Sequence, residues 1–372
     1  MDHELRALER DAHEKRDAAS VLHLVRRLEA VGEHARARGE LTSFLDVTEV
    51  RREAIRRAPP AHECAIPERV PGVRWTLADG QRTSRGLIQA TLGAVVAVRE
   101  ERRRYREIRV LDPLTGSTRF AVPIGEDRPV ALVAGDVLLL ARQPGSLGRA
   151  EIDGYDLATG ERIFEVPIAA NALALASDGD IIVSTPECIA KLRWPDHSRP
   201  PGEPCWTRRP TDEIRHCRDG FVVVREDVYD CVLYEKTGEE RFRDHLAFAD
   251  AFGEVRAHNG FAFRGHFIDS VLDASPRYIL DIDRIFDRTN GQVVGFGERR
   301  DRDEILATFE MARILLDGFL WGERGRLRSH RIDGSVRWTR ELEGGTGVFA
   351  VLPGLIYAET GLGLVCLEEP AA

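Results

Sequence analysis

The sequence predicts an all-β protein, a seven-bladed β-propeller, preceded by a small α-helical domain. Three observations lead to this fold. A hairpin phrase recurs six times between residues 112 and 338, its turn glycines are 36 to 53 residues apart, and a repeated tetrapeptide links the two ends of the chain. A repeat of about 40 residues is the length of one four-stranded propeller blade.

The first segment of the chain has apolar residues at helical rather than strand spacing. Two stripes predict a helical hairpin that turns at Gly32: Val21, Leu24, Val25 and Leu28, then Ala37, Leu41, Phe44 and Leu45. Asp46 and Glu49 have the spacing of a capping box, which predicts a further helix through Ile55. Three or four short helices are therefore expected.

The predicted domain boundaries follow from a change of pattern. Pro59 and Pro60 forbid continuation of the last helix. Beyond residue 70 the chain consists of short apolar or alternating runs separated by Gly, Asp and Pro, which predict strands: 94–98, 137–140, 181–183 and 221–224 are the clearest. We expect a helical domain over 1–58, a linker over 59–70 and the propeller over 71–370.

The hairpin phrase consists of an acidic or polar residue, a turn that ends in Gly, and an aromatic residue four positions later. Its copies are Asp112–Gly116 with Phe120, Asp156–Gly160 with Phe164, Gly202 with Trp206, Gly238 with Phe242, an imperfect copy at Asp287–Gly291 with Phe296, and Gly334 with Trp338. Glycine supplies the positive φ of the turn, and the residues before it bond the turn backbone. The aromatic side chain lies on the returning strand, where it can pack between neighbouring sheets.

The two ends of the chain predict how the ring closes. Residues 73–76 repeat residues 336–339 letter for letter, yet no hairpin precedes the first copy. The C-terminus has three predicted strands, 348–352, 355–358 and 363–367, and lacks a fourth. We therefore expect the strand containing Trp75 to pair with 363–367 and complete the seventh blade, which protects sheet edges. Pro71 occupies the position of the turn glycine in the other copies. A strand that comes from another part of the chain follows no hairpin turn, so it needs no glycine there.

Composition and charge predict the cellular compartment of the protein and the classes of partner that it does not bind. The net charge of -9 disfavours nucleic acid, and the excess of arginine over three lysines is typical of a GC-rich, bacterial genome. Ten charged residues among the first twenty lead us to expect no secretory signal here, and no window approaches the 18 to 20 apolar residues that cross a bilayer. We expect a cytoplasmic protein with no membrane insertion.

The phrase D-x-x-T-G-x-x-x-aromatic resembles the quinoprotein-like (PQQ-type) propeller repeat, over about 300 residues. WD-repeat proteins of the wider superfamily match less well, because no Gly-His or Trp-Asp signature recurs. The helical hairpin is weakly similar to a tetratricopeptide unit at Leu24, Gly32, Ala37 and Leu41. The resemblance implies either a secreted dehydrogenase that holds pyrroloquinoline quinone and calcium, or a non-catalytic binding propeller.

The residues favour the second alternative. The dehydrogenases carry a signal peptide, usually eight blades and a pair of adjacent cysteines, whereas the six cysteines here are scattered. Asp281, Asp283 and Asp287 could suggest a calcium site. Strand alternation and the turn phrase explain them better, because Asp281 and Asp283 share one face and Asp287 begins a turn. We expect no cofactor, no metal and no catalytic residue.

The function expected is therefore a non-catalytic protein-binding or scaffolding module of a bacterial cytoplasmic assembly; the alternative is an enzyme or small-ligand binder with a site at the central channel. Candidate partner-binding residues lie where the repeat departs from its regular length. The 53-residue interval between Gly238 and Gly291 contains a predicted loop, 264–276, that is too apolar for a solvent loop, and a charge run follows at 298–304. The candidates are Phe267, Ile268, Val271, Leu272, Arg299, Arg300 and Arg302.

Overall fold

The computed structural model describes the helical segment, most of the strands and their shorter turns. Up to residue 208 it covers 2–57, 63–78, 89–101, 104–124, 130–142, 151–170, 172–175, 180–196 and 199–208. Between 213 and 296 it describes the strands given below and a few residues beside them. From 312 to 369 it covers all residues except 324, 344–345 and 361–362.

Four helices open the chain: α1 (Asp2–Lys15), α2 (Ala18–Ala30), α3 (His34–Ser43) and α4 (Thr48–Arg56). Both predicted apolar stripes are buried, and Gly32 turns the chain between α2 and α3 with a φ of 84°. The predicted capping box is wrong. Val47 precedes α4 and makes no side-chain cap, because the Asp46 carboxylate accepts hydrogen bonds from Arg16 instead.

The strands after the helices form eight antiparallel sheets among the described residues. The first sheet contains β2 (Gln89–Ala90), β3 (Val95–Glu101), β4 (Arg104–Leu111) and β5 (Thr118–Pro123); the second contains β6 (Val130–Ala134), β7 (Val137–Arg142), β8 (Glu151–Asp156) and β9 (Arg162–Val166). The third contains β10 (Ala172–Leu175), β11 (Ile181–Ser184), β12 (Ile189–Leu192) and β13 (Pro204–Arg208); the fourth contains β14 (Glu213–Arg218), β15 (Phe221–Arg225), β16 (Asp230–Glu235) and β17 (Glu240–His245).

The remaining sheets continue in chain order. The fifth has three strands, β18 (Gly253–Val255), β19 (Phe261–Phe263) and β20 (His266–Ile268); the sixth contains β21 (Val271–Ala274), β22 (Tyr278–Asp281), β23 (Arg284–Asp287) and β24 (Val293–Phe296). The seventh contains β25 (Ala312–Ile314), β26 (Gly318–Glu323), β27 (Arg326–Arg331) and β28 (Val336–Glu341); the eighth contains β29 (Thr346–Leu352), β30 (Leu355–Thr360), β31 (Gly363–Glu368) and β1 (Gly72–Ala78).

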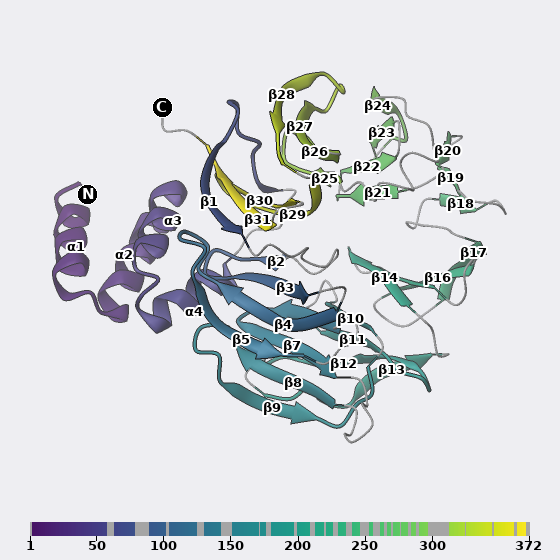
Figure 1. The fold of residues 1–372 in the computed structure, drawn as a ribbon, viewed down its shortest axis with the longest axis horizontal. Coiled ribbons are helices and arrows are strands. Elements are labelled where there is room, and N and C mark those ends of the chain that lie inside the picture. Colours follow the sequence, from purple (N-terminus) through teal and green to yellow (C-terminus); the bar gives the residue numbers. More distant parts are fainter. Residues whose placement is uncertain are drawn as a thin grey trace.

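The sheets follow one another around a ring, the arrangement of a β-propeller (Figure 1). The first strands of neighbouring sheets lie side by side, as β6, β10 and β14 show, and β2 of the first sheet contacts β29 of the last. The predicted count of seven blades is not confirmed. Three described strands, β18–β20, form a separate sheet in the interval that we had assigned to a single blade with a long loop.

The predicted pairing of the two chain ends is confirmed. Strand β1 pairs antiparallel with β31, and Trp75 lies opposite Cys366. The ion pair between Arg74 and Glu368 joins the same two strands. The eighth sheet therefore takes one strand from the N-terminal part of the chain and three from the C-terminal part.

The hairpin phrase has the predicted local chemistry and also links neighbouring sheets. Asp112 Oδ1 accepts the N–H groups of Leu114 and Thr115, and Gly116 has a φ of 71°. The ring of Trp75 covers this turn so closely that a Cβ added to Gly116 would lie 2.6 Å from the ring. The Trp75 Nε1–H also donates a hydrogen bond to Pro113 O at 3.0 Å. Each such contact ties the outer strand of one sheet to a turn of the next.

The eighth sheet has no hairpin turn before its fourth strand, because β1 comes from the N-terminal part of the chain. Residues 63–71 take the place of that turn. Trp338 of β28 donates its Nε1–H to Pro67 O at 2.7 Å, as Trp75 does to Pro113 O. Ile66 is buried, and its N–H donates to Asp317 Oδ1. The segment expected to be a linker is thus packed against the seventh sheet over its described residues.

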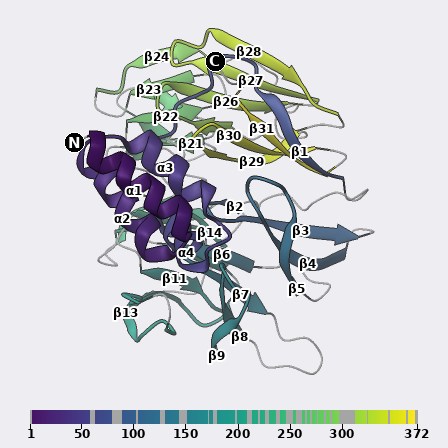
Figure 2. The ribbon, with the colours of Figure 1, turned by 90° about the vertical axis from the view of Figure 1, so that its left-hand side faces the viewer.

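The helices pack on the sheets through one continuous apolar cluster. Helical residues such as Leu28, Leu41 and Val50 share this cluster with Val95 of the first sheet and Tyr357 of the eighth. Figure 2 shows the four helices together in front of the sheets. The helical segment and the propeller therefore share a core.

Candidate functional site

The predicted partner-binding residues fall in two neighbouring sheets. Phe267 and Ile268 lie on β20, opposite Ala262 and Phe261. Val271 and Leu272 lie on β21, the first strand of the sixth sheet. The segment 264–276 was predicted as a loop, and that is wrong, because its apolar and β-branched residues form two short strands instead. Their role in binding stays a prediction, and Arg299, Arg300 and Arg302 lie outside the described residues.

Helix α4 contacts one face of the propeller. It reaches the β2–β3, β6–β7 and β8–β9 turns, which lie at one end of the sheets because antiparallel strands alternate in direction. Arg52 Nε bonds Asp156 Oδ2 at 3.0 Å, Arg56 Nη2 bonds Asp136 Oδ2 at 2.7 Å, and Arg51 Nη1 donates to Ala158 O at 2.8 Å. No sequence motif predicted these contacts.

Gly93 allows α4 to approach the first sheet. A Cβ at this position would be 2.8 Å from the carbonyl oxygen of Arg51 and would also meet the Ile55 side chain. Ile55 is buried among Ala94, Val96 and residues of the second sheet. The helix is therefore fixed by close packing as well as by ion pairs.

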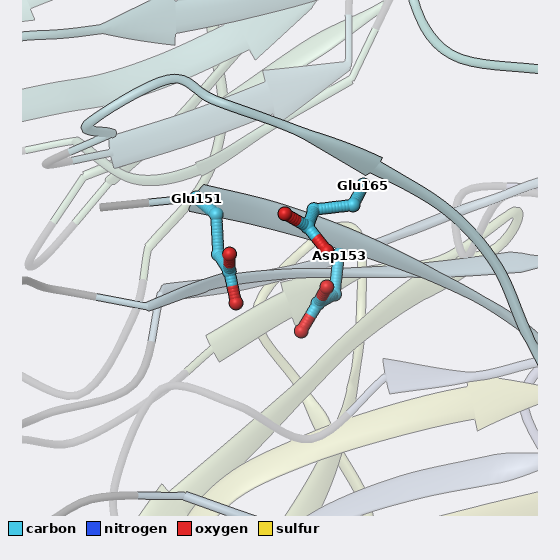
Figure 3. Close-up of side chains that lie close together, drawn as sticks. All are labelled: Glu151, Asp153 and Glu165. Atoms are coloured by element: carbon cyan, nitrogen blue, oxygen red, sulfur yellow. The ribbon is translucent and has the colours of Figure 1, made fainter. Parts of the chain in front are cut away.

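Three carboxylates gather on the second sheet (Figure 3). Glu151 and Asp153 lie on one face of β8, Glu165 is the cross-strand partner of Asp153, and their oxygens lie within 4.8 Å of one another. Arg162 bridges Asp153 Oδ1 at 3.1 Å and Glu165 Oε2 at 3.2 Å, while the Tyr155 hydroxyl donates to Asp153 Oδ2. This arginine supplies a structural counter-charge, so we assign the cluster no ion.

The predicted turn role of Asp287 is confirmed. Gly291 N–H donates to Asp287 O, and the Asp287 carboxylate lies 3.8 Å from Arg277. Asp281 lies on β22 and pairs with Val271 of β21, and Asp283 lies outside the described residues.

The two buried cysteines described have weakly acidic thiols. Burial raises the pKa of Cys64 to about 11 and that of Cys366 to about 12. Both groups are protonated thiols near neutral pH, and the thiolate is the nucleophilic form. They therefore serve as small apolar core residues.

A concave surface lies at the β12–β13 connection. This connection joins the third and fourth strands of its sheet, as the β8–β9 turn does in the second sheet, so both lie on the propeller face that α4 contacts. The cavity has a volume of about 470 Å³. Prolines and charged side chains line it, including Pro195, Pro200, Arg193 and Arg199.

No protein-family model matches the chain, and no curated protein sequence matches it. Among solved structures, BamB from Moraxella catarrhalis is similar with 14% identity and a TM-score of 0.42, over 74% of this chain and 79% of that one. The computationally designed protein Ika8 is similar with 13% identity and a TM-score of 0.55, over 80% of this chain and all of that one. The likeness to Ika8 concerns the fold alone. Within the described residues, no helix is long and apolar enough to cross a bilayer.

Proposed function

We propose that the protein is a non-catalytic protein-binding scaffold of a bacterial cytoplasmic assembly, built on PQQ-type propeller repeats. The observation that supports this proposal most is the shared core of the helices and the sheets. Leu41 and Val50 of the helical segment pack in one cluster with residues of the first and eighth sheets. Helices and turn loops then form one preorganised surface, which lowers the entropic cost of binding a partner.

The contacts of α4 support the same proposal. Arg51, Arg52 and Arg56 bind turn groups of the second sheet, so the helical segment has a defined position on the propeller face. A scaffold needs such fixed geometry, because partners bound to the helices and to the propeller must be held in a constant arrangement.

A reconstitution experiment tests the proposed function. The full chain, tagged at its C-terminus, is used to capture proteins from its native cell, and each candidate is then purified and mixed with it. We expect at least one complex of fixed stoichiometry on size-exclusion chromatography with light scattering. If no captured protein forms such a complex, the scaffold function is refuted.

The candidate residues on β20 and β21 allow a sharper test. Phe267→Ala and Leu272→Asp should weaken capture of the reconstituted partner and change the melting temperature little if these side chains form the interface, since exposed substitutions cost within about 0.5 kcal/mol. If they are core residues, the same changes should cost roughly 2 to 5 kcal/mol, and their interface role should then be dropped.

Quinone-dependent catalysis, the activity of the dehydrogenases that the repeat resembles, is checked by adding pyrroloquinoline quinone and calcium to the purified protein. We expect no dye-linked oxidation of alcohols or sugars above the rate without protein. Turnover well above that background would contradict a non-catalytic role.

A further inference from the structure

The β12–β13 connection is longer than the turns of the hairpin phrase and is built around a buried side chain. Asp112–Gly116 and Asp156–Gly160 reverse the chain in five residues, whereas here β12 ends at Leu192 and β13 begins at Pro204. Trp194 is 1% exposed, and its ring meets Phe164 of the second sheet edge-on at 6.2 Å between centroids.

Hydrogen bonds hold the connection in place from both sides of Trp194. Gly202 N–H donates to Arg193 O at 2.8 Å and closes the base of the loop. Trp194 N–H donates to Asp180 Oδ1 at 2.9 Å, and its indole Nε1–H donates to Arg199 O at 2.7 Å. Several prolines further restrict the backbone. The described part of the loop is therefore ordered before any ligand binds.

The shape of the cavity favours one class of ligand. All eight lining residues are exposed, so the cavity of about 470 Å³ is an open dish. Small-molecule sites surround most of the ligand surface, which an open dish cannot do. A side chain that projects from another protein fills such a dish while its own backbone covers the rim.

We propose that this dish receives an exposed aromatic side chain, tryptophan or tyrosine, of a protein partner. The rings of Pro195 and Pro200 offer flat apolar surface, and the guanidinium groups of Arg193 and Arg199 are attracted to the negative face of an aromatic ring. Asp196 lies 3.4 Å from Arg199 Nε and orients its guanidinium. Aromatic anchors in preformed pockets supply much of the energy of protein interfaces.

This inference rests on the proposed scaffold function and names the chemistry of one partner contact. The indole N–H of Trp194 is a built-in reporter, because it bonds the carbonyl group of a lining residue, Arg199. The full chain is prepared with isotope-labelled tryptophan, its five indole signals are assigned through single Trp→Phe variants, and N-acetyl-L-tryptophanamide is titrated. N-acetyl-L-leucinamide is the apolar control ligand.

We expect a saturable shift of the Trp194 signal, with a dissociation constant on the order of 1 mM, and no such shift with the leucine compound. Arg193→Gln and Arg199→Gln should each weaken binding about two- to five-fold. Arg331→Gln, at an exposed arginine on β27, is the matched control and should bind like the wild type.

Three results would overturn the inference: no shift of Trp194, equal shifts with the leucine compound, or unchanged affinity in both arginine variants. If the tryptophan-probe test fails but a stable complex is reconstituted, only the proposed role of the dish is refuted. Failure of every reconstitution refutes the scaffold function itself, whatever the probe does.

Discussion

Trp75→Ala should destabilise the propeller because Trp75 joins three parts of the ring. The residue lies on β1, pairs across to β31, and covers the Asp112–Gly116 turn of the first sheet. Removing a fully buried tryptophan costs about 3 to 5 kcal/mol. Trp75 is half-buried, so we expect about 2 to 4 kcal/mol, including about 1 kcal/mol for its hydrogen bond to Pro113 O.

Two variants separate these contributions. Trp75→Phe keeps a smaller ring on β1 but loses the hydrogen bond and part of the indole contact with Gly116. Pro113 O still accepts from the Tyr357 hydroxyl at 3.1 Å, so no acceptor is orphaned and the cost should be about 1 to 2 kcal/mol. Val73→Ala is the matched control on the same strand, where an exposed side chain should cost within about 0.5 kcal/mol.

The assay is equilibrium unfolding in guanidinium chloride, followed by circular dichroism and by fluorescence of the remaining tryptophans. The expected order of destabilisation is Trp75→Ala, then Trp75→Phe, then Val73→Ala. If Trp75→Ala unfolds at the same midpoint as Val73→Ala, the contact between β1 and the first sheet does not stabilise the ring.

Three further predictions concern other described contacts. Gly93→Ala should cost roughly 1 to 3 kcal/mol and expose α4 to proteolysis. The control is Gly39→Ala on α3, where an added Cβ meets nothing within 4 Å, and it should stabilise the chain by about 0.5 to 1 kcal/mol. Equal effects of the two variants in thermal unfolding would refute the close approach of α4. Burial opposes ionisation of Asp112, but the hydrogen bond and the charge of Arg119 and the backbone N–H groups of Leu114 and Thr115 together outweigh it and lower the Asp112 pKa below its usual 3.8. This carboxylate therefore stabilises the fold above about pH 4, and the stabilisation is lost as pH falls through the lowered pKa. The difference in unfolding free energy between wild type and Asp112→Asn should therefore shrink from pH 7 to pH 3, and a constant difference would contradict the pairing. Iodoacetamide at pH 8 should leave Cys64 and Cys366 unmodified in the native protein by peptide mass mapping, since burial raises both thiol pKa values; rapid labelling of either would show that its site is open.

Local turn chemistry explains why much of the sheet architecture could be predicted. Asp112 and Gly116 form their turn through bonds within five residues, so the pattern is visible in the sequence. The pairing of the chain ends was predictable because residues 73–76 repeat residues 336–339 of β28, the fourth strand of the seventh sheet, and the C-terminal strands lack a fourth strand of their own. The sheet count failed where β18–β20 have three residues each and carry no copy of the phrase.

Long-range partners explain the remaining errors. Asp46 has capping-box spacing, but Arg16 from the end of α1 takes its carboxylate. The positions of α4 and of the carboxylate cluster depend on contacts between residues far apart in the sequence or across strands, such as Arg52 with Asp156 and Asp153 with Glu165. Spacing along the chain does not encode them. The β12–β13 dish depends likewise on how Trp194 is buried.

Hydrogen exchange measured by mass spectrometry in increasing guanidinium chloride tests the central claim most directly, namely that α4, β1 and the C-terminal strands belong to one body. The peptides to compare cover Thr48–Arg56, Gly72–Ala78 and Gly363–Glu368. The shared core and the β1–β31 pairing predict that all three become exchangeable at the same denaturant concentration, in one cooperative transition. Exchange of Gly72–Ala78 without denaturant, while Gly363–Glu368 stays protected, would contradict it.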